Sequence, residues 1–564
     1  LSARVWASRR RSDNYRERNE TEVDNLGARI GYEHDGGRLF AEIEHTATDQ
    51  QLPGSLFAHE MDAGPDQVRA ELDRIRVQED LPASLLSAFA EGGRDRVSAV
   101  RCGAPRALLA PSGKTGALPG GFLAGGRDRV LSELRAVGAR QQLPDSLLDD
   151  LLGADRRQSV DAYEGDFSEA DTDVARLGLR QHLTDDWWLE AELTRRDEER
   201  EFQISFRGFA GTPATQDRTT DTFSPRIIGH LAPAGLPLDL TLGADWEQTD
   251  YRLETAFGPQ TVDQTVSGIY VQGVARPVPE WTLTAGVRRA WVDNRITQRE
   301  QVSVKDRTFD VQRPYDLDDR VTLGSLGAAW TPRPGWRLFA RADQNFRFAT
   351  VDEHTNPVFD QPVGLDNQTG VSYETGAAFA WDRGRIELTL YRLDLENEIS
   401  FDATGFANVN LDETRREGLT LEGEMTPAAG WRLGADYAHT SAEITDGPFE
   451  GRDTPLVPEH TGKVYLDKDF GPAWTLHTEA VIVGRQVLGG DFENRFPRLD
   501  PYTLVNVHLR YSRGPIEVSL RANNLLNELY SESGAVGTDA AFTSRAAYFP
   551  APRRNFWVEA AYDF

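Results

Sequence analysis

One pattern recurs along the chain: a short turn, a tryptophan and then apolar residues at every second position. Side chains alternate between the two faces of a strand, so each such run is a strand with one apolar face. A tryptophan at a fixed height beside a turn is typical of the aromatic girdle at a membrane interface. The runs are Trp187 to Leu193, Trp281 to Val287, Trp336 to Ala342, Trp431 to Tyr437 and Trp474 to Leu476, with Leu238 to Trp246 carrying its tryptophan at the far end.

The last stretch, Asn555 to Phe564, carries the alternation to the end of the chain. Phe556, Val558 and Ala560 fall on one face, and the sequence stops on an aromatic residue. In a soluble sheet such a strand would be an exposed apolar edge that invites aggregation. A strand that closes a barrel in lipid has no free edge. The stretch therefore predicts a transmembrane β-barrel.

The composition agrees with a large barrel. Apolar residues make up 39% of the sequence, below the roughly 45–50% of typical globular chains. Aromatic residues are nevertheless plentiful, with 12 Trp, 15 Tyr and 26 Phe. A wide barrel lines its lumen with polar side chains, which lowers the apolar share. No apolar run approaches the roughly 18–20 residues of a spanning helix. The expected fold is all-β, a transmembrane antiparallel β-barrel.

A soluble array such as a propeller also repeats tryptophan. Its blades would space the tryptophans regularly, whereas positions 187, 281, 336, 431 and 474 keep no fixed period. The connections instead alternate between short turns and long loops, as in outer-membrane barrels. Counting the strands gives about 20, each long enough for the roughly 9–11 tilted residues of a membrane span. A barrel of this size has a lumen wide enough for a plug.

Charge and cysteine content narrow the range of partners. The formal net charge is −28, from 90 acidic and 62 basic residues. This balance disfavours nucleic acid, because phosphate contacts need Lys and Arg. Cys102 is the only cysteine, so an intramolecular disulfide is impossible. The sequence opens at Leu1 without the signal peptide that an outer-membrane protein needs. We therefore interpret it as a fragment, or as a mature form that lacks its front.

Residues 49–170 break the rhythm of strands. The segment is internally duplicated: Leu-Pro-x-Ser-Leu begins at Leu52, Leu81 and Leu143, and Gly92 to Val97 returns as Gly125 to Val130. Apolar residues in two parts of it keep helical spacing, which predicts short amphipathic helices. Because it lies between an upward and a downward strand, we assign it as one expanded, partly helical extracellular loop. The alternative is a poorly ordered low-complexity insertion.

Signatures of catalysis fail one by one. Gly113-Lys114-Thr115 ends like a phosphate loop, but Leu108 takes the place of the first glycine and no strand precedes it. The sequence has no His-Glu-x-x-His motif, and none of its histidines joins a serine in a recognisable hydrolase motif. The sequence therefore predicts a protein that is not an enzyme and has no catalytic residues.

One acidic run could bind a metal. Clustered carboxylates are hard-oxygen ligands suited to calcium. The run consists of Asp161, Glu164, Asp166, Glu169, Asp171 and Asp173. Its spacing is not that of a known calcium loop, so a solvated loop is the favoured interpretation and a loop calcium the alternative. We expect no other cofactor.

Three passages resemble those of the TonB-dependent outer-membrane receptors, which import siderophores, haem, cobalamin and similar ligands. Asn523 to Tyr530 (NNLLNELY) resembles the N-N-L-x-D-x-x-Y passage, with Asn527 where Asp is commoner, and Asn555 to Phe564 resembles the closing strand. Asn345 to Glu353 (NFRFATVDE), followed by Ser372 to Gly376 (SYETG), is similar to the F-R-A-P-T-x-x-E and S-Y-E-x-G passages. The resemblance implies TonB-energised uptake of a bulky, scarce ligand, with a ferric siderophore or cobalamin-like chelate favoured.

The sequence also departs from that family. Members have about 22 strands around an amino-terminal plug, and they carry a signal peptide and a TonB-binding box before the plug. The opening, Leu1 to Arg16, resembles what usually follows the first strand pair. The resemblance therefore implies that residues 1–564 form the barrel domain, with about 20 of 22 strands. TonB would act only through the missing plug, and the chain would be a monomer in the lipid of a Gram-negative outer membrane.

Ligand selection would come from aromatic and charged groups on the extracellular loops. The candidates are Phe206, Arg207, Phe209, Phe257, His354, Phe492 and Arg495. In the haem-receptor subgroup a ligand histidine follows the F-R-A-P passage. Here Phe348 and Ala349 replace its last two residues. We therefore interpret His354 as an exposed loop histidine, and haem as a ligand is not favoured.

The alternation also predicts which side chains of one strand face lipid. We expect Leu283, Ala285 and Val287 to face lipid, and Thr282, Thr284 and Arg288 to face the lumen, since a charge at mid-bilayer costs about 2–4 kcal/mol. Two other functions stay open at this point. One is a passive channel without a plug, and the other is a surface adhesin that acts through residues 49–170.

Overall fold

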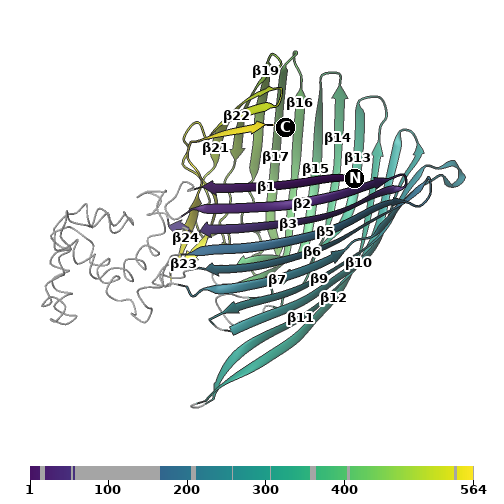
Figure 1. Cartoon of the computed structure of the whole chain (residues 1–564). Coiled ribbons are helices and arrows are strands. Elements are labelled where there is room, and N and C mark those ends of the chain that lie inside the picture. Colours follow the sequence, from purple (N-terminus) through teal and green to yellow (C-terminus); the bar gives the residue numbers. More distant parts are fainter. Residues whose placement is uncertain are drawn as a thin grey trace, which may run out of the picture.

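In the computed structural model, 22 strands form an antiparallel sheet that curves into a barrel wall, and three further strands form a small separate sheet (Figure 1). The short turns of the wall gather at one end, called here the turn end, and its long connections gather at the other, called the loop end. The structure describes residues 1–12, 19–52, 55–57, 166–204, 211–256, 258–304, 307–355, 364–402, 407–538 and 543–562.

The described residues contain strands β1 to β25 and a single-turn 3-10 helix, Pro233–Gly235. The strands are β1 (Ser2–Ser12), β2 (Thr21–His34), β3 (Gly37–Gln51), β4 (Leu56–Phe57), β5 (Phe167–His182), β6 (Trp187–Gln203), β7 (Ala214–Phe223), β8 (Arg226–Leu231), β9 (Leu238–Thr255), β10 (Gly258–Val278), β11 (Trp281–Val304), β12 (Arg307–Trp330), β13 (Trp336–Arg347), β14 (Gln368–Trp381), β15 (Gly384–Asp402), β16 (Ala407–Met425), β17 (Trp431–Asp446), β18 (Arg452–Asp453), β19 (His460–Phe470), β20 (Trp474–Val483), β21 (Tyr502–Arg513), β22 (Ile516–Asn523), β23 (Ser531–Thr538), β24 (Ser544–Pro550) and β25 (Asn555–Tyr562).

The 22-stranded wall crosses between its two ends 20 times. β7 and β8 make one crossing, because both pair with β6 on one side and β9 on the other. The break between them falls at Pro225, which has no N–H to give to a ladder. β18 only extends the edge of β17. The expected count of about 20 strands is confirmed.

The two ends of the sheet are not joined in the part of the chain that the structure describes. There β1 pairs only with β2, and β25 pairs only with β22. Phe556 and Val558 of β25 are accordingly 70% and 74% exposed. One edge of the wall is therefore open at each of these two strands.

Aromatic side chains form a band at the turn end, as the sequence predicts. The Trp281 and Trp330 rings stack across neighbouring strands with centroids 5.8 Å apart, and Trp336 meets Phe379 at 4.8 Å. The turns beside the band are tight. Gly335 adopts a φ of +84°, and a Cβ there would lie 2.3 Å from the Ala380 carbonyl oxygen. Only glycine fits such a position, which explains why glycine precedes the tryptophan.

The two faces of β11 differ in exposure as the alternation predicts. Leu283 and Val287 are 41% and 53% exposed, and Ala285 between them is exposed. Thr282, Thr284 and Arg288 are half-buried on the opposite face. Arg288 donates from Nη1 to Asp245 Oδ2 at 2.6 Å, so the inner face carries polar contacts. The predicted split between an outer apolar and an inner polar face is confirmed.

Asn524 holds the turn that leaves β22, within the NNLLNELY passage. Its side chain is 2% exposed, and its backbone has a φ of +49°. Its Nδ2 donates to the Glu528 carbonyl at 2.8 Å, and its Oδ1 accepts from the Glu528 N–H at 2.7 Å. The Asn506 side chain accepts from the Asn524 N–H at 2.9 Å. Asparagine suits the site because its amide completes a turn and tolerates the left-handed backbone.

The long insertion is shorter than predicted. β3 ends at Gln51 and β5 begins at Phe167, so the connection covers residues 52–166 rather than 49–170. Glu169, Asp171 and Asp173 therefore lie on β5 and not in a solvated loop, and Asp173 pairs with His45 Nδ1 at 2.9 Å. Asp161, Glu164, the predicted helices and Cys102 lie outside the described residues. In the described part of the chain, none of the helices has the length and apolarity to span a membrane.

Candidate ligand site inside the barrel mouth

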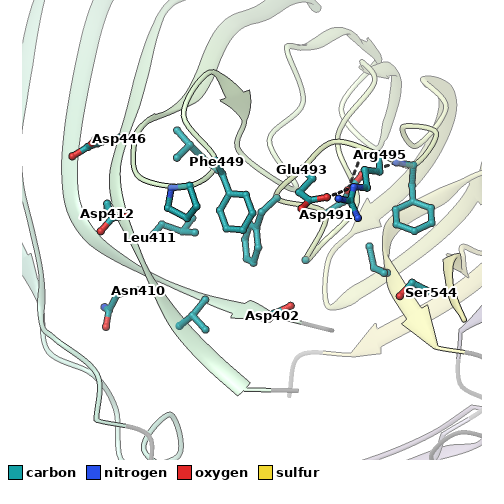
Figure 2. Close-up of a pocket in the computed structure, with 17 residues that line it drawn as sticks. Asp402, Asn410, Leu411, Asp412, Asp446, Phe449, Asp491, Glu493, Arg495 and Ser544 are labelled. Atoms are coloured by element: carbon teal, nitrogen blue, oxygen red, sulfur yellow. Dashed lines mark hydrogen bonds and ion pairs between the residues drawn. The ribbon is translucent and has the colours of Figure 1, made fainter. Parts of the chain in front are cut away.

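A cavity of about 410 Å³ lies at the loop end, against the inner side of the wall (Figure 2). β15, β16 and β17 supply one side of its lining. The connection after β17 and the connection between β20 and β21 supply the other, with contributions from β23 and β24. The cavity thus gathers residues that are distant in sequence, from Asp402 to Ser544.

The floor of the cavity is apolar. Leu411, Ile444 and Phe492 are 4%, 1% and 5% exposed and belong to one cluster. The Phe449 ring packs against Phe492 with centroids 5.4 Å apart, and Figure 2 shows Phe449 near its centre. β17 carries a bulge at Thr445, because Glu413 lies opposite Asp446 while the next residue, Thr414, lies opposite Ile444. Leu411 and Thr414 of the facing β16 are three residues apart, and both are buried. Such a bulge re-aims side chains at the rim of a barrel.

The rim of the cavity is acidic. Five carboxylates line it, from Asp402, Asp412, Asp446, Asp491 and Glu493. Arg495 is the one cation among the described lining residues, and it is ion-paired with Glu493. In Figure 2 Asp412 and Asp446 lie on the far side of the phenyl rings from Arg495. The lining therefore carries more acidic than basic side chains.

The connection between β20 and β21 is held rigidly over the cavity. Asp491 is 4% exposed, and its two carboxylate oxygens accept from the backbone N–H groups of Arg495 and Phe496 at 2.9 and 3.0 Å. Asn494 donates from Nδ2 to the Asp453 carbonyl at 3.0 Å and accepts from the Asp453 N–H at 2.9 Å. This reciprocal pair ties two connections together. A site built from pre-organised loops loses less entropy when it binds a ligand.

A small sheet flanks the cavity on the β25 side. β23 pairs with β24, and β24 also pairs with β4 of the long insertion, with Ala547 opposite Phe57. Gly489 bonds the same sheet through two backbone hydrogen bonds, to Gly534 and Val536. Burial raises the pKa of the Tyr548 hydroxyl, and nearby Asp500 adds to the effect. The long insertion therefore begins against the last connection of the barrel.

The FRFATVDE passage folds onto the opposite inner wall. Phe348 packs against Ala290 and Val292, and Val351 joins a separate cluster formed by inward residues of β6 to β11. Arg347 is ion-paired with Glu353, whose carboxylate also accepts from the Thr350 N–H at 2.8 Å. The passage is therefore a structural feature that fills part of the lumen near the mouth.

The structure brings two of the candidate ligand residues together. Phe492 and Arg495 both line the cavity. His354 does not: it is 1% exposed, within the passage on the opposite wall, so its interpretation as an exposed loop histidine is wrong. The sequence pattern could not show that this connection folds inward. The remaining candidates, Phe206, Arg207, Phe209 and Phe257, lie outside the described residues and stay predictions.

Several cavity residues escaped the sequence analysis. Phe449 was one. Its flanking glycines, Gly447 and Gly451, both adopt positive φ and could have indicated a turn that presents an aromatic ring to the lumen. Asp412 was another, because its neighbours Leu411 and Thr414 are three residues apart and both buried, which breaks the alternation that would have placed it.

The family model described as TonB dependent receptor-like, beta-barrel, matches residues 122–525 of the sequence. The chain belongs to this family. Members are receptors and transporters of Gram-negative outer membranes, not enzymes, so the predicted recognition, fold and non-enzymatic function are confirmed. The match spans most of the wall, from within the long insertion to the turn that Asn524 holds.

Solved structures share the fold at low sequence identity. The ferric-catecholate import receptor Fiu from E. coli K12 is 12% identical, with a TM-score of 0.68 over 100% of this chain and 77% of that chain. The ferric citrate transporter FecA is 13% identical, with a TM-score of 0.69 over 99% and 73%. The copper transporter OprC is 11% identical, with a TM-score of 0.68 over 100% and 75%. All three chains are longer than the part this receptor barrel matches.

Proposed function

We propose that this receptor takes up a bulky metal chelate that carries no net negative charge. The observation that supports the proposal is the lining of the cavity, where five carboxylates and one paired arginine surround an aromatic floor. An apolar, aromatic floor suits the organic part of a chelate. A carboxylate rim repels anions and attracts ammonium groups, because like and unlike charges interact over several ångströms in a partly enclosed site.

The solved relatives support a metal-bearing ligand in general. Fiu is a ferric-catecholate import receptor, FecA a ferric citrate transporter and OprC a copper transporter. The acidic rim disfavours a strongly anionic catecholate complex as the ligand, since such a complex would meet a lining with more acidic than basic side chains. A cationic or neutral chelate, such as a ferric hydroxamate bearing an amine, fits the lining better.

The outer surface supports a position in lipid. Apolar side chains such as Leu283 and Val287 are exposed on the wall, above an aromatic band of the kind that marks a membrane interface. We place the wall in the outer membrane, with the loop end outside the cell. TonB would act through a plug region, as the resemblance implies. A monomer suffices, because a single chain supplies the whole described lining of the cavity.

Deleting the gene tests this function. Cells that lack the full-length receptor should lose uptake of radioactive iron from a cationic ferric hydroxamate, and the plasmid-borne gene should restore it. Collapse of the proton gradient should stop the restored uptake. Unchanged growth and uptake with every chelate tried would contradict the function. Uptake that persists without the gradient would instead indicate a passive channel.

A further inference from the structure

Two histidines face each other on the outside of the wall at the loop end. His439 of β17 lies opposite His460, the first residue of β19, in the antiparallel ladder. Trp431, Leu433 and Tyr437 are exposed at alternate positions along the same outer face of β17. His439 continues that face, so the pair lies just beyond the apolar stretch and outside the cavity.

A carboxylate completes a set of three metal-binding side chains. Glu459 directly precedes His460, and one donor atom from each of His439, Glu459 and His460 lies within 4.8 Å of the others. The imidazole rings stack with centroids 4.9 Å apart, and His460 Nε2 is 3.6 Å from Glu459 Oε1. Glu459 is 58% and His460 49% exposed. Tetrahedral zinc keeps its donors about 3.4 Å apart, which rotation of these exposed side chains can supply.

Hydrogen bonds orient both rings for such a role. His439 Nδ1 lies 3.2 Å from the Glu459 carbonyl oxygen, and His460 Nδ1 lies 2.9 Å from the Tyr437 hydroxyl. A carbonyl accepts, so His439 carries its proton on Nδ1 and leaves the Nε2 lone pair for a metal. Metal-binding histidines commonly donate their other ring nitrogen to a carbonyl in this way, which fixes the tautomer and the ring.

We propose that Nε2 of His439, Nε2 of His460 and the Glu459 carboxylate bind one transition-metal ion on the outer rim of the barrel. Imidazole and carboxylate donors suit zinc and copper(II), and copper(II) should bind more tightly. The ion would join β17 to β19 at the base of the connection that carries Phe449 into the cavity. The site shares no residue with the cavity, so it does not depend on the proposed chelate uptake.

Titration of the purified full chain in detergent with copper(II) or zinc tests the site. We expect one ion per chain at this site, bound more tightly as copper(II) than as zinc, with calcium showing no binding there. The double variant His439→Ala/His460→Ala should abolish that binding, and Glu459→Gln should weaken it roughly tenfold. His230→Ala is the matched control, since His230 is an exposed strand histidine that pairs with Asp239.

The outcomes separate the proposal from misfolding. The double variant should keep the β-sheet circular dichroism of the wild type, and His230→Ala should keep full metal affinity. In the copper(II) complex, electron paramagnetic resonance should show two nitrogen ligands, reduced to none in the double variant. Copper(II) binding that survives unchanged in the double variant would overturn the assignment, as would a wild-type chain that binds no ion.

Discussion

The two ends of this barrel are built by different rules. At the turn end, connections are short, a glycine such as Gly335 reverses the chain, and tryptophans from successive strands form a band. The long connections lie at the loop end, where some of their side chains fold inward and polar groups such as Asp491 and Asn494 hold them. The connections at the turn end resemble one another, whereas those at the loop end differ from one another in length and in the side chains that hold them.

This difference separates the part of the molecule that makes a barrel from the part that makes a receptor. The periodic wall needs only alternation and turns, so many sequences satisfy it, as the solved structures at 11–13% identity illustrate. The loop end needs particular residues at particular places. Its cavity charge, its bulge in β17 and its tied connections are therefore where ligand specificity can change without loss of the fold.

The largest effect should come from placing a charge on the outer face of the wall. Ala285→Arg should lower the free energy of unfolding in phospholipid vesicles by about 2–4 kcal/mol, because it puts arginine in the hydrocarbon. Thr284→Arg is the matched control on the next position, which faces inward. Urea titration of both variants measures the difference. Equal losses of unfolding free energy in the two variants would contradict the assignment of one face to lipid and of the other to the lumen.

The next largest effect concerns the turn after β22, which the Asn524 side chain holds at the loop end. Asn524→Ala removes three hydrogen bonds made by a side chain that belongs to a residue only 2% exposed. We expect a loss of about 1–3 kcal/mol in the free energy of unfolding, since the backbone groups of Glu528 and Pro552 lose their partner. Leu526→Ala, at a position 63% exposed in the same turn, should change little. Similar losses of stability in both variants would show that the Asn524 side chain does not hold the turn.

A smaller effect should follow from neutralising the rim of the cavity. The double variant Asp412→Asn/Asp446→Asn should weaken binding of a cationic ferric chelate by about 1 kcal/mol, roughly fivefold, because each exposed charge contributes only part of that. Affinity for an anionic chelate should rise. Isothermal titration measures both, with Glu280→Gln at the turn end as the control. If the variant leaves both affinities unchanged, the carboxylates of the rim do not contribute to ligand selection.

The smallest effect should come from loosening a connection without touching the ligand. Asn494→Ala breaks the reciprocal bonds to Asp453. Chelate affinity should fall by about 0.5–1 kcal/mol through lost pre-organisation. The midpoint of urea unfolding should barely move, since the wall is intact. Glu450→Ala, an exposed change in the connection after β17, serves as the control. A large loss of stability would show that the connection supports the wall.

The sequence could predict the regular wall and the turn end better than the loop end. Strand count, outer and inner faces, turns and family followed from alternation and from passages such as NNLLNELY. Phe492 and Arg495 were chosen as aromatic and charged loop residues, and they do line the cavity. His354 was misjudged because its burial depends on a tertiary contact of Val351 and Phe348 with the far wall. Asp412 was missed because Leu411 and Thr414, three residues apart on the same strand, are both buried, which a period of two does not predict.

The central claim is that the loop end selects a chelate by its charge. The most direct test is the ratio of affinities of the purified full-length receptor for two ferric chelates of similar size, one bearing a free ammonium group and one bearing several uncompensated negative charges. The account predicts tighter binding of the cationic complex, by about tenfold or more, with the preference shrinking as ionic strength rises. Equal affinities, or a preference for the anionic complex, would contradict it.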